Sequence, residues 1–237
     1  MKRPLVVTID GPAGAGKSAT ARELARHLGI PYLDTGAMYR AVAVAAAMEG
    51  CSVPPGSARE REALAELARK IRFVPGPGLG DLKVSWGEQD LLPRLRSPEA
   101  SHMASLVSAV PEVRRELVQQ QRELVRSAGG GVVEGRDMGT VVFPDATVKV
   151  FLTASAEERA NRRWQELARR NVDVTLEDVL AQQRERDQRD ASREHSPLRP
   201  AAGAIILDTS AMGLEQVVTE LLALVRARTG VDVPGIP

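Results

Sequence analysis

The sequence predicts an α/β fold in three layers, with a parallel sheet of about five strands, helices on both faces and a small antiparallel β insert. An apolar run at residues 5–9 leads through a glycine-rich loop into a helical pattern, and a second strand and helix follow by residue 50. Short apolar runs return after residue 129 in "GVVEGRD", "TVKVFL" and "AIILD". Strands that alternate with helices in this way are typical of a parallel sheet.

The first two strands and helices follow from local signals. Residues 5–9 form a short run rich in β-branched side chains, which the turn sequence "DGP" ends. The helix predicted from about Lys17 stops before Gly29, and its apolar face consists of Ala21, Leu24, Ala25 and Leu28. A strand in "PYLD" ends at Asp34, and the helix in "GAMYRAVAVAAAME" ends at Gly50.

The middle of the chain has a different pattern. "REREALAELARK" predicts an exposed amphipathic helix. Residues 71–92 then alternate short apolar runs with Gly/Pro and Gly-Glu turns, which predicts a small antiparallel sheet inserted between α/β units. A long helix is expected over residues 111–126, and three glycines at 129–131 end it.

Residues 155–195 are dominated by charge, with nine Arg against ten Asp and Glu. Because the two signs nearly cancel, this stretch predicts two helices with mixed faces rather than a basic tail. A solvated pair of surface helices is the ordinary explanation of such a segment.

The composition narrows the possible partners. The 32 basic and 31 acidic side chains leave a net charge of +1, and aromatic residues make up only 3% of the chain, so neither nucleic acid nor a membrane surface is an expected partner. A single cysteine, Cys51, excludes an internal disulfide and a cysteine-based zinc site and favours a reducing compartment. No apolar run approaches the ~18 residues of a membrane span, and the first strand leaves no room for a signal peptide, so we expect a soluble, cytoplasmic protein.

One motif carries a specific chemistry. "GPAGAGKS", residues 11–18, matches G-x-x-x-x-G-K-[ST] and lies between a predicted strand and a predicted helix, as that motif requires. Its backbone N–H groups and the helix N-terminus would cradle phosphates, Lys17 would reach the β- and γ-phosphates, and the Ser18 hydroxyl would bind Mg²⁺. The motif predicts binding of a nucleoside triphosphate but does not identify an acceptor.

Two further clusters follow buried strands, at the edge where parallel sheets bind ligands. In "LDTGAMYR", Asp34 could lie beside Mg²⁺ and Arg40 could clamp an anionic acceptor, although an N-capped helix explains Asp34 equally well. In "EGRDMGTVVFPD", Arg136 and Asp137 could bind a ligand or could simply pair with each other.

A fourth cluster lies in the charged segment. In "RERDQRDASREHSPL", Arg186, Asp190 and Arg193 stand at i, i+4 and i+7, so a helix would present all three on one face. Pairs that stabilise the helix are the ordinary explanation, and only an external ligand would make these residues functional.

Taken together and in this order, the four clusters and the insert before "SAVPEVRRE" closely resemble the bacterial cytidylate kinases over nearly the whole chain. The β-rich insert distinguishes that group from adenylate and uridylate kinases. The resemblance implies ATP-dependent phosphorylation of CMP and dCMP to the diphosphates with Mg²⁺ as cofactor, and we expect a monomer.

The resemblance also implies a set of site residues. The ATP-binding loop consists of Gly11, Pro12, Ala13, Gly14, Ala15, Gly16, Lys17, Ser18 and Ala19. The CMP-binding set is Thr35, Arg40, Ser105, Arg114, Arg136, Asp137, Arg186, Asp190 and Arg193. Within it, Arg40 and Arg136 bind the acceptor phosphate and Arg193 makes another acceptor contact. The cytosine edge is read by Ser105, Arg114 and Asp137.

The remaining implied roles concern the sugar, the metal and the transferred group. Arg186 and Asp190 face the sugar, and Thr35 lies near the acceptor. Ser18 and Asp34 bind Mg²⁺. Catalysis is assigned to Lys17 with Arg159 and Arg163, which could reach the transferred phosphoryl group. One departure from the family pattern is Ala191, where many relatives carry Ser after the Asp, so the contact of that hydroxyl is absent here.

The implied division of the chain has three parts. Residues 1–40, 113–154 and 196–237 form a core, residues 41–112 an acceptor-binding region with the insert at about 71–92, and residues 155–195 a mobile lid.

Three alternatives remain open at this point. Another P-loop kinase, for UMP or for a small metabolite such as shikimate, differs only in its acceptor. A P-loop switch or ATPase acting on a protein or nucleic acid would hydrolyse ATP without a small acceptor and would bind polyanions in a salt-sensitive manner. A catalytically dead nucleotide-binding scaffold is disfavoured, because Lys17, Ser18 and the cluster arginines are all present.

Overall fold

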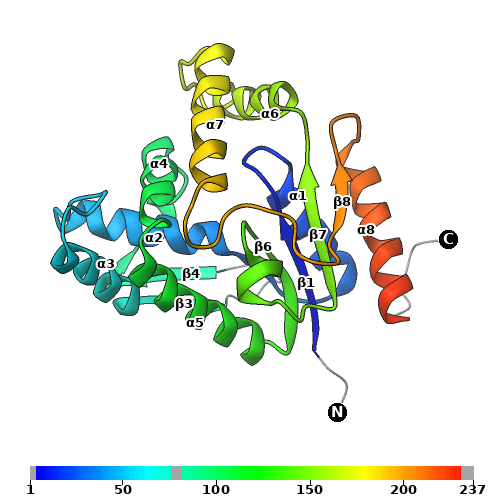
Figure 1. The fold of residues 1–237 in the computed structure, drawn as a ribbon, viewed down its shortest axis with the longest axis horizontal. Coiled ribbons are helices and arrows are strands. Elements are labelled where there is room, and N and C mark those ends of the chain that lie inside the picture. The colour runs from blue at the N-terminus through cyan, green and yellow to red at the C-terminus, as the bar shows by residue number, and fades with distance from the viewer. Residues whose placement is uncertain (1–3, 76–81, 231–237) are drawn as a thin grey trace. The chain divides into compact units, whose positions relative to one another are not determined.

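The computed structural model describes residues 4–75 and 82–230, which fall into two compact units (Figure 1). The first unit contains Met1–Pro4 and Ile30–Gly131, and the second contains Leu5–Gly29 and Val132–Pro237. The five segments predicted as core, acceptor region and lid divide the chain differently, and that finer division stays a prediction. None of the described helices has the length and apolar character needed to cross a membrane.

The main sheet has five strands in the order β2-β6-β1-β7-β8. Its strands are β1 (Leu5–Asp10), β2 (Tyr32–Asp34), β6 (Gly130–Gly135), β7 (Val148–Thr153) and β8 (Ile205–Asp208). β7 runs parallel to both of its neighbours, with Val7 of β1 opposite Val148 and Val150 opposite Ile205 of β8. Val7 and Ile9 are fully buried because β1 lies in the middle of the sheet, covered on both faces. The predicted α/β fold with a five-stranded parallel sheet is confirmed.

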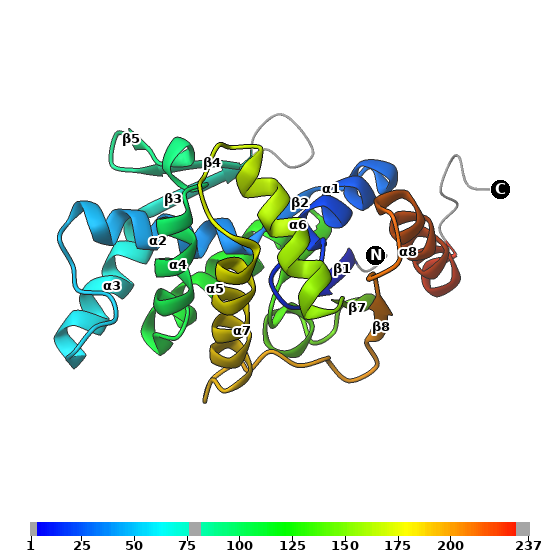
Figure 2. The same cartoon turned by 90° about the horizontal axis from the view of Figure 1, so that it is seen from above.

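Two pairs of helices belong to the second unit. α1 (Lys17–Leu28) and α8 (Leu214–Thr229) pack against each other beside the sheet, as Figure 2 shows from above. The predicted start of α1 at Lys17 and its end before Gly29 are confirmed. The charged stretch forms α6 (Ala156–Ala168) and α7 (Leu176–Ala191), which share a small apolar cluster of Ala160, Leu167 and Val179. Two helices with mixed faces were therefore predicted correctly.

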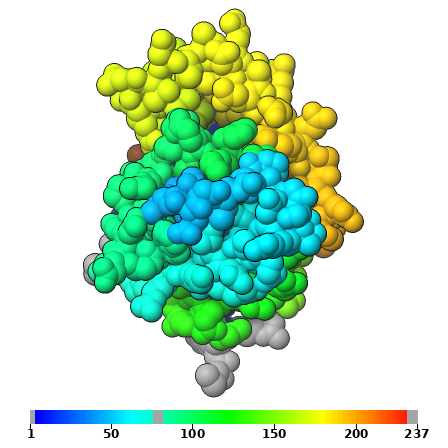
Figure 3. Space-filling view, turned by 90° about the vertical axis from the view of Figure 1, so that its left-hand side faces the viewer, coloured from blue at the N-terminus to red at the C-terminus, as the bar shows by residue number. Residues whose placement is uncertain are grey.

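The first unit is built around a helix that is rich in alanine. α2 (Thr35–Met48) is buried along most of its length and packs against α3 (Ala58–Lys70), α4 (Pro98–Val107) and α5 (Pro111–Ser127). α3 shows its charged face at the surface, among the blue and cyan atoms of Figure 3, while Leu64 and Leu67 point into the unit. α4 was not predicted, because the small and polar residues that follow Ser97-Pro98 are also typical of a loop.

The predicted antiparallel insert is confirmed within the described residues. β3 (Ile71–Pro75), β4 (Leu82–Trp86) and β5 (Gln89–Asp90) form a three-stranded sheet in that order. Ile71 lies opposite Trp86, and Ser85 opposite Asp90. Residues 76–81, which belong to the predicted insert, lie outside the described residues.

Candidate active site

The glycine-rich loop takes the path that its sequence predicts, from the end of β1 to the first turn of α1. Gly14 and Gly16 have φ angles of 78° and 85°, which favour glycine. A Cβ atom on Gly14 would lie 2.9 Å from the Arg159 Cβ, so a side chain would not fit there. Glycine at this position therefore lets the loop backbone pack closely against Arg159, and the positive end of the α1 dipole lies at the end of the loop.

Lys17 is buried beneath this loop. Its Nζ donates a hydrogen bond to the Pro12 carbonyl at 2.7 Å, so the ammonium group is held against the loop backbone. Burial, followed by the positive charge of Arg136, lowers the pKa of Lys17 to about 7. A lysine whose burial outweighs the attraction of the acids near it is suited to receive an anion such as a polyphosphate.

The two predicted metal ligands have different surroundings. Ser18 is exposed on the first turn of α1, beside the phosphate cradle. Asp34 belongs to the first unit, where Oδ1 accepts from the Ala37 N–H at 2.9 Å and caps α2, while Oδ2 accepts from Arg40 at 2.7 Å. Within the described ranges, no group of three or more His, Cys, Asp or Glu residues could hold a metal ion. A hydroxyl beside a phosphate cradle suits Mg²⁺, which proteins usually hold together with substrate phosphates.

In the first unit, several predicted CMP-binding residues come from α2, α4 and α5. Ser105 of α4 is 5% exposed, and its Oγ has no hydrogen-bond partner among the residues that the structure describes. Arg114 of α5 is also buried, donates to the Ser108 carbonyl at 3.1 Å and lies 5.7 Å from the centre of the Tyr39 ring. Thr35 is buried at the start of α2. An unpaired buried hydroxyl is costly unless a ligand satisfies it, so Ser105 makes this part of the unit a candidate binding region.

In the second unit, the structure brings four predicted CMP-binding residues together around one carboxylate. Asp190 is 1% exposed and accepts from Arg136 at 2.9 Å and from Arg193, while Arg186 lies 4.0 Å away. Burial alone would raise the pKa of Asp190, but Arg136, Arg193 and Arg186 outweigh it and hold the pKa below its ordinary value. Three guanidinium groups around one carboxylate leave a positive excess that suits a phosphate group.

Arg159 and Arg163 were predicted to act on the transferred group, and they differ in burial. Arg159 is buried, and its Nη1 donates to the Ala13 carbonyl of the loop at 3.1 Å and pairs with Asp187 of α7 at 2.6 Å. Arg163 is partly exposed and pairs with Glu166 of its own helix at 2.7 Å. The structure thus brings Arg159 to the phosphate-binding loop, whereas the contact it gives Arg163 lies within α6.

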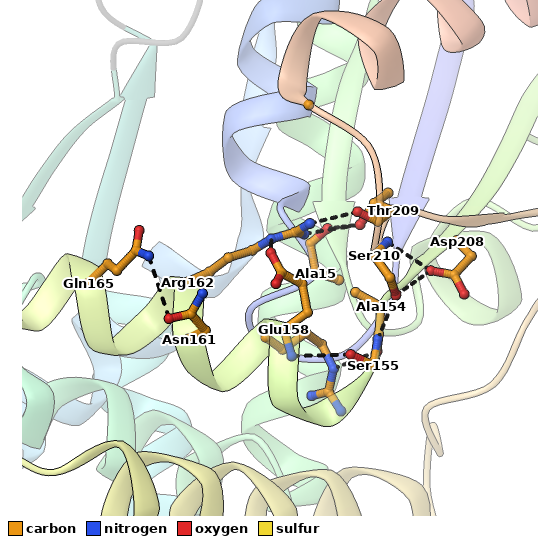
Figure 4. A network of polar contacts seen from close by, with 12 residues as sticks. Ala15, Ala154, Ser155, Glu158, Asn161, Arg162, Gln165, Asp208, Thr209 and Ser210 are labelled. Carbon is orange, nitrogen blue, oxygen red and sulfur yellow. Dashed lines mark hydrogen bonds and ion pairs between the residues drawn. The ribbon is translucent and has the colours of Figure 1, made fainter.

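Sequence reasoning missed Arg162, which stands between these two arginines. Figure 4 shows it reaching from α6 to Thr209, where Nη2 donates to the Thr209 carbonyl at 2.6 Å and Nη1 to the Thr209 Oγ1 at 3.1 Å. The Thr209 Oγ1 hydroxyl has two carbonyls within donating distance, that of Thr153 at 3.1 Å and that of Ala15 at 3.4 Å, and Glu158 accepts from the Arg162 guanidinium at 2.8 Å. This network ties α6, the loop after β8 and the phosphate-binding loop together. Its only signal in the sequence is the spacing of Arg162 from Arg159, three residues along the same helix.

Two buried acids at the ends of strands were also missed. Asp10 is the last residue of β1, and Glu134 lies near the end of β6. Both are buried, and the negative charge of each raises the pKa of Lys17, against the effect of burial. An acidic residue that closes an apolar run was a signal that could have found them, because buried carboxylates are rare unless they are paired.

These features define a class of protein. A parallel sheet, a glycine-rich loop with a buried lysine at its carboxyl edge, and clustered arginines are the parts of a P-loop kinase. The family model described as cytidylate kinase matches residues 7–227, and the chain belongs to that family.

Relatives support the same assignment. The cytidylate kinase of Carboxydothermus hydrogenoformans is 44% identical over 225 residues, covering 95% of this chain and 99% of the relative. The cytidylate kinase of Pelotomaculum thermopropionicum is 47% identical over 222 residues, covering 93% of this chain and 96% of the relative. A solved structure of an uncharacterized protein from Eubacterium ventriosum shares the fold with a TM-score of 0.51 at 12% identity, covering 96% of this chain and 100% of that one.

Proposed function

We propose that this protein transfers the γ-phosphoryl group of ATP to CMP and dCMP, forming ADP and the corresponding diphosphate. Its membership of the cytidylate kinase family, with a match over residues 7–227, carries this proposal. The phosphate-binding loop, the buried Lys17 and the unpaired Ser105 hydroxyl are the structural features that support it.

The donor half of the reaction belongs to residues 11–19. Backbone N–H groups of the loop and the Lys17 ammonium would hold the β- and γ-phosphates of ATP. Ser18 would hold Mg²⁺ together with the nucleotide, and the metal would supply neutralisation of charge on the phosphate oxygens. Asp34 is the second proposed metal residue, although its two oxygens already serve the α2 cap and Arg40.

The acceptor half has three proposed parts. Arg40 and Arg136 bind the phosphate of CMP, and Arg193 adds a further contact. Ser105, Arg114 and Asp137 match the amino group, ring nitrogen and carbonyl of cytosine. Arg186 and Asp190 bind the sugar, with Thr35 near the acceptor. Leaving such buried polar groups unpaired against another base is costly, which would give the enzyme its preference for cytosine.

The chemistry needs alignment and charge neutralisation rather than a base. An oxygen of the CMP phosphate attacks the γ-phosphorus, the bond to the β–γ bridging oxygen breaks, and ADP leaves with that electron pair. The acceptor oxygen is already ionised near neutral pH, so no residue has to remove a proton. Lys17 and the arginines stabilise the charge on the group in flight, and Arg159 and Arg163 are the proposed helical contributors.

Residues 155–195 are proposed as a lid that excludes water, which would otherwise compete with CMP for the γ-phosphate. α6 and α7 have an apolar cluster of their own, which is what a segment that moves as a body requires. We further propose that the protein acts as a cytoplasmic monomer on free nucleotides, without nucleic acid or a membrane as partner, and the balanced charge of the chain supports the absence of polyanion binding.

A panel of acceptors tests the proposal. Release of ADP is measured with ATP, Mg²⁺ and each of CMP, dCMP, UMP, AMP and shikimate. We expect strong release with CMP and dCMP and little with the others. Activity on UMP, AMP or shikimate without activity on CMP would refute the proposed acceptor.

A further inference from the structure

Asp10 connects the phosphate-binding loop to the segment that follows β6. It is the last residue of β1, is 2% exposed, and immediately precedes Gly11. Its Oδ1 accepts the Met138 N–H at 2.8 Å, and its Oδ2 accepts the Gly139 N–H, also at 2.8 Å. Both oxygens of one buried carboxylate are therefore used on two consecutive backbone amides.

These amides open a π-helical turn, η2 (Met138–Val142), directly after Arg136 and Asp137. The N–H of Met138 belongs to the peptide group that joins it to Asp137. A hydrogen bond to that N–H fixes the plane of the peptide and with it the ψ angle of Asp137, which is 22°. The Asp137 side chain is itself 2% exposed, so its placement depends on the backbone that carries it.

The charge of Asp10 is consistent with this arrangement. Burial raises the pKa of Asp10 to about 6, although the bonds from Gly139 and Met138 lower it. Of the nearby charged groups, Asp137 raises the pKa and Lys17 lowers it. At pH 7 and above, Asp10 is therefore mostly ionised and can accept from both amides at once.

We infer that Asp10 is a positioning residue for the acceptor: by binding the Met138 and Gly139 amides it holds Asp137 in the geometry that receives CMP. This inference rests on the proposed function, which gives Asp137 its role toward CMP. Because Asp10 also precedes the phosphate-binding loop, one residue ties the donor cradle to the segment that binds the acceptor.

The variant Asp10→Asn separates this role from a merely structural one. Asparagine has the same shape but only one acceptor oxygen, so its NH₂ group faces one of the two amide N–H groups. We expect the KM for CMP to rise about tenfold or more, while the KM for ATP changes by less than about twofold. A merely structural role would lower thermal stability without changing the ratio of the two constants.

The matched control is Asp145→Asn, an exposed residue in the turn after η2. It removes the same charge and should leave both KM values unchanged. If folded Asp10→Asn keeps the wild-type KM for CMP, or if its KM for ATP rises by the same factor, the inference is wrong. If the wild-type protein does not phosphorylate CMP, the proposed function fails, and that result is separate from the outcome for Asp10.

A measurement on the wild-type protein covers the case in which Asp10→Asn does not fold. In ¹⁵N-labelled protein, CMP should shift the amide resonances of Met138 and Gly139 clearly more than that of Leu221, a buried residue of α8. If CMP binds and these two amides do not respond, Asp10 does not act on the acceptor and the inference is overturned.

Discussion

The buried lysine of the phosphate-binding loop should take up a proton when ATP binds. Burial, together with the positive charge of Arg136, lowers the pKa of Lys17 to about 7. The phosphates of ATP would place negative charge beside Nζ and raise the pKa again. At pH 8 roughly nine in ten molecules of the free protein would carry a neutral Lys17, so binding should take up about 0.9 proton per ATP.

The same shift predicts how ATP affinity depends on pH. The lysine is about half protonated at pH 7 and about 1% protonated at pH 9, so the Kd for ATP should rise roughly 50-fold, or about 2.3 kcal/mol, between these values. The sign follows from the lowered pKa, because the form that binds phosphate is lost as pH rises through about 7.

Calorimetry with a non-hydrolysable ATP analogue measures this uptake directly. Titrations at pH 8 in two buffers with different ionisation enthalpies give the number of protons taken up. The control is Lys17→Arg, because a guanidinium group stays charged throughout this range, and uptake should disappear. Uptake near zero in the wild type, or equal uptake in Lys17→Arg, would refute the reasoning.

Three further predictions concern base recognition, acid stability and the network of Figure 4. In steady-state assays, Ser105→Ala should raise the KM for CMP about fivefold, because it removes one hydrogen bond to the base. The control Ser101→Ala, on the same helix, should leave the KM for CMP unchanged. Asp190→Asn should cost about 3–5 kcal/mol in urea unfolding at pH 7, because it removes the negative charge of a buried carboxylate that accepts from both Arg136 and Arg193. The pKa of Asp190 is lower in the folded than in the unfolded protein, so its ionised form contributes fully to the free energy of unfolding above the unfolded pKa of about 4. This contribution is lost as the pH falls below that value. The free energy of unfolding of the variant should therefore depend less on pH in the acid range. Arg162→Ala should raise the KM for ATP by about tenfold, because Thr209, which lies beside the Ala15 carbonyl of the loop, loses its contacts with the guanidinium. The control Arg184→Ala removes only an exposed ion pair with Glu157 and should leave the KM for ATP unchanged. Equal KM values in the two variants would contradict this prediction.

The parts of the fold that were predictable depend on local signals. The phosphate-binding loop follows from glycines and a lysine at fixed spacing between a strand and a helix, and the insert follows from alternating runs split by turns. α4 was missed because its residues are as common in loops as in helices. The η2 turn depends on the carboxylate of Asp10, which lies more than a hundred residues earlier in the chain.

The same distinction applies to the candidate site. The cluster of Arg136, Asp190 and Arg193 was predictable as a set through the family pattern, but its arrangement around a buried carboxylate depends on tertiary contacts. Arg162 resembles its neighbours in sequence and is distinguished only by Thr209, 47 residues away along the chain. In the sequence, Asp10 is recognisable only as the end of a strand. Its role as a positioning residue is inferred from the hydrogen bonds that it accepts from the Met138 and Gly139 amides.

The dependence of ADP formation on CMP tests the central claim most directly. ATP and Mg²⁺ are supplied with and without CMP, and ADP and CDP are quantified together by chromatography. We expect little ADP without CMP, and with CMP equal amounts of ADP and CDP. ADP formed at the same rate without CMP, or formed with CMP but without CDP, would contradict it.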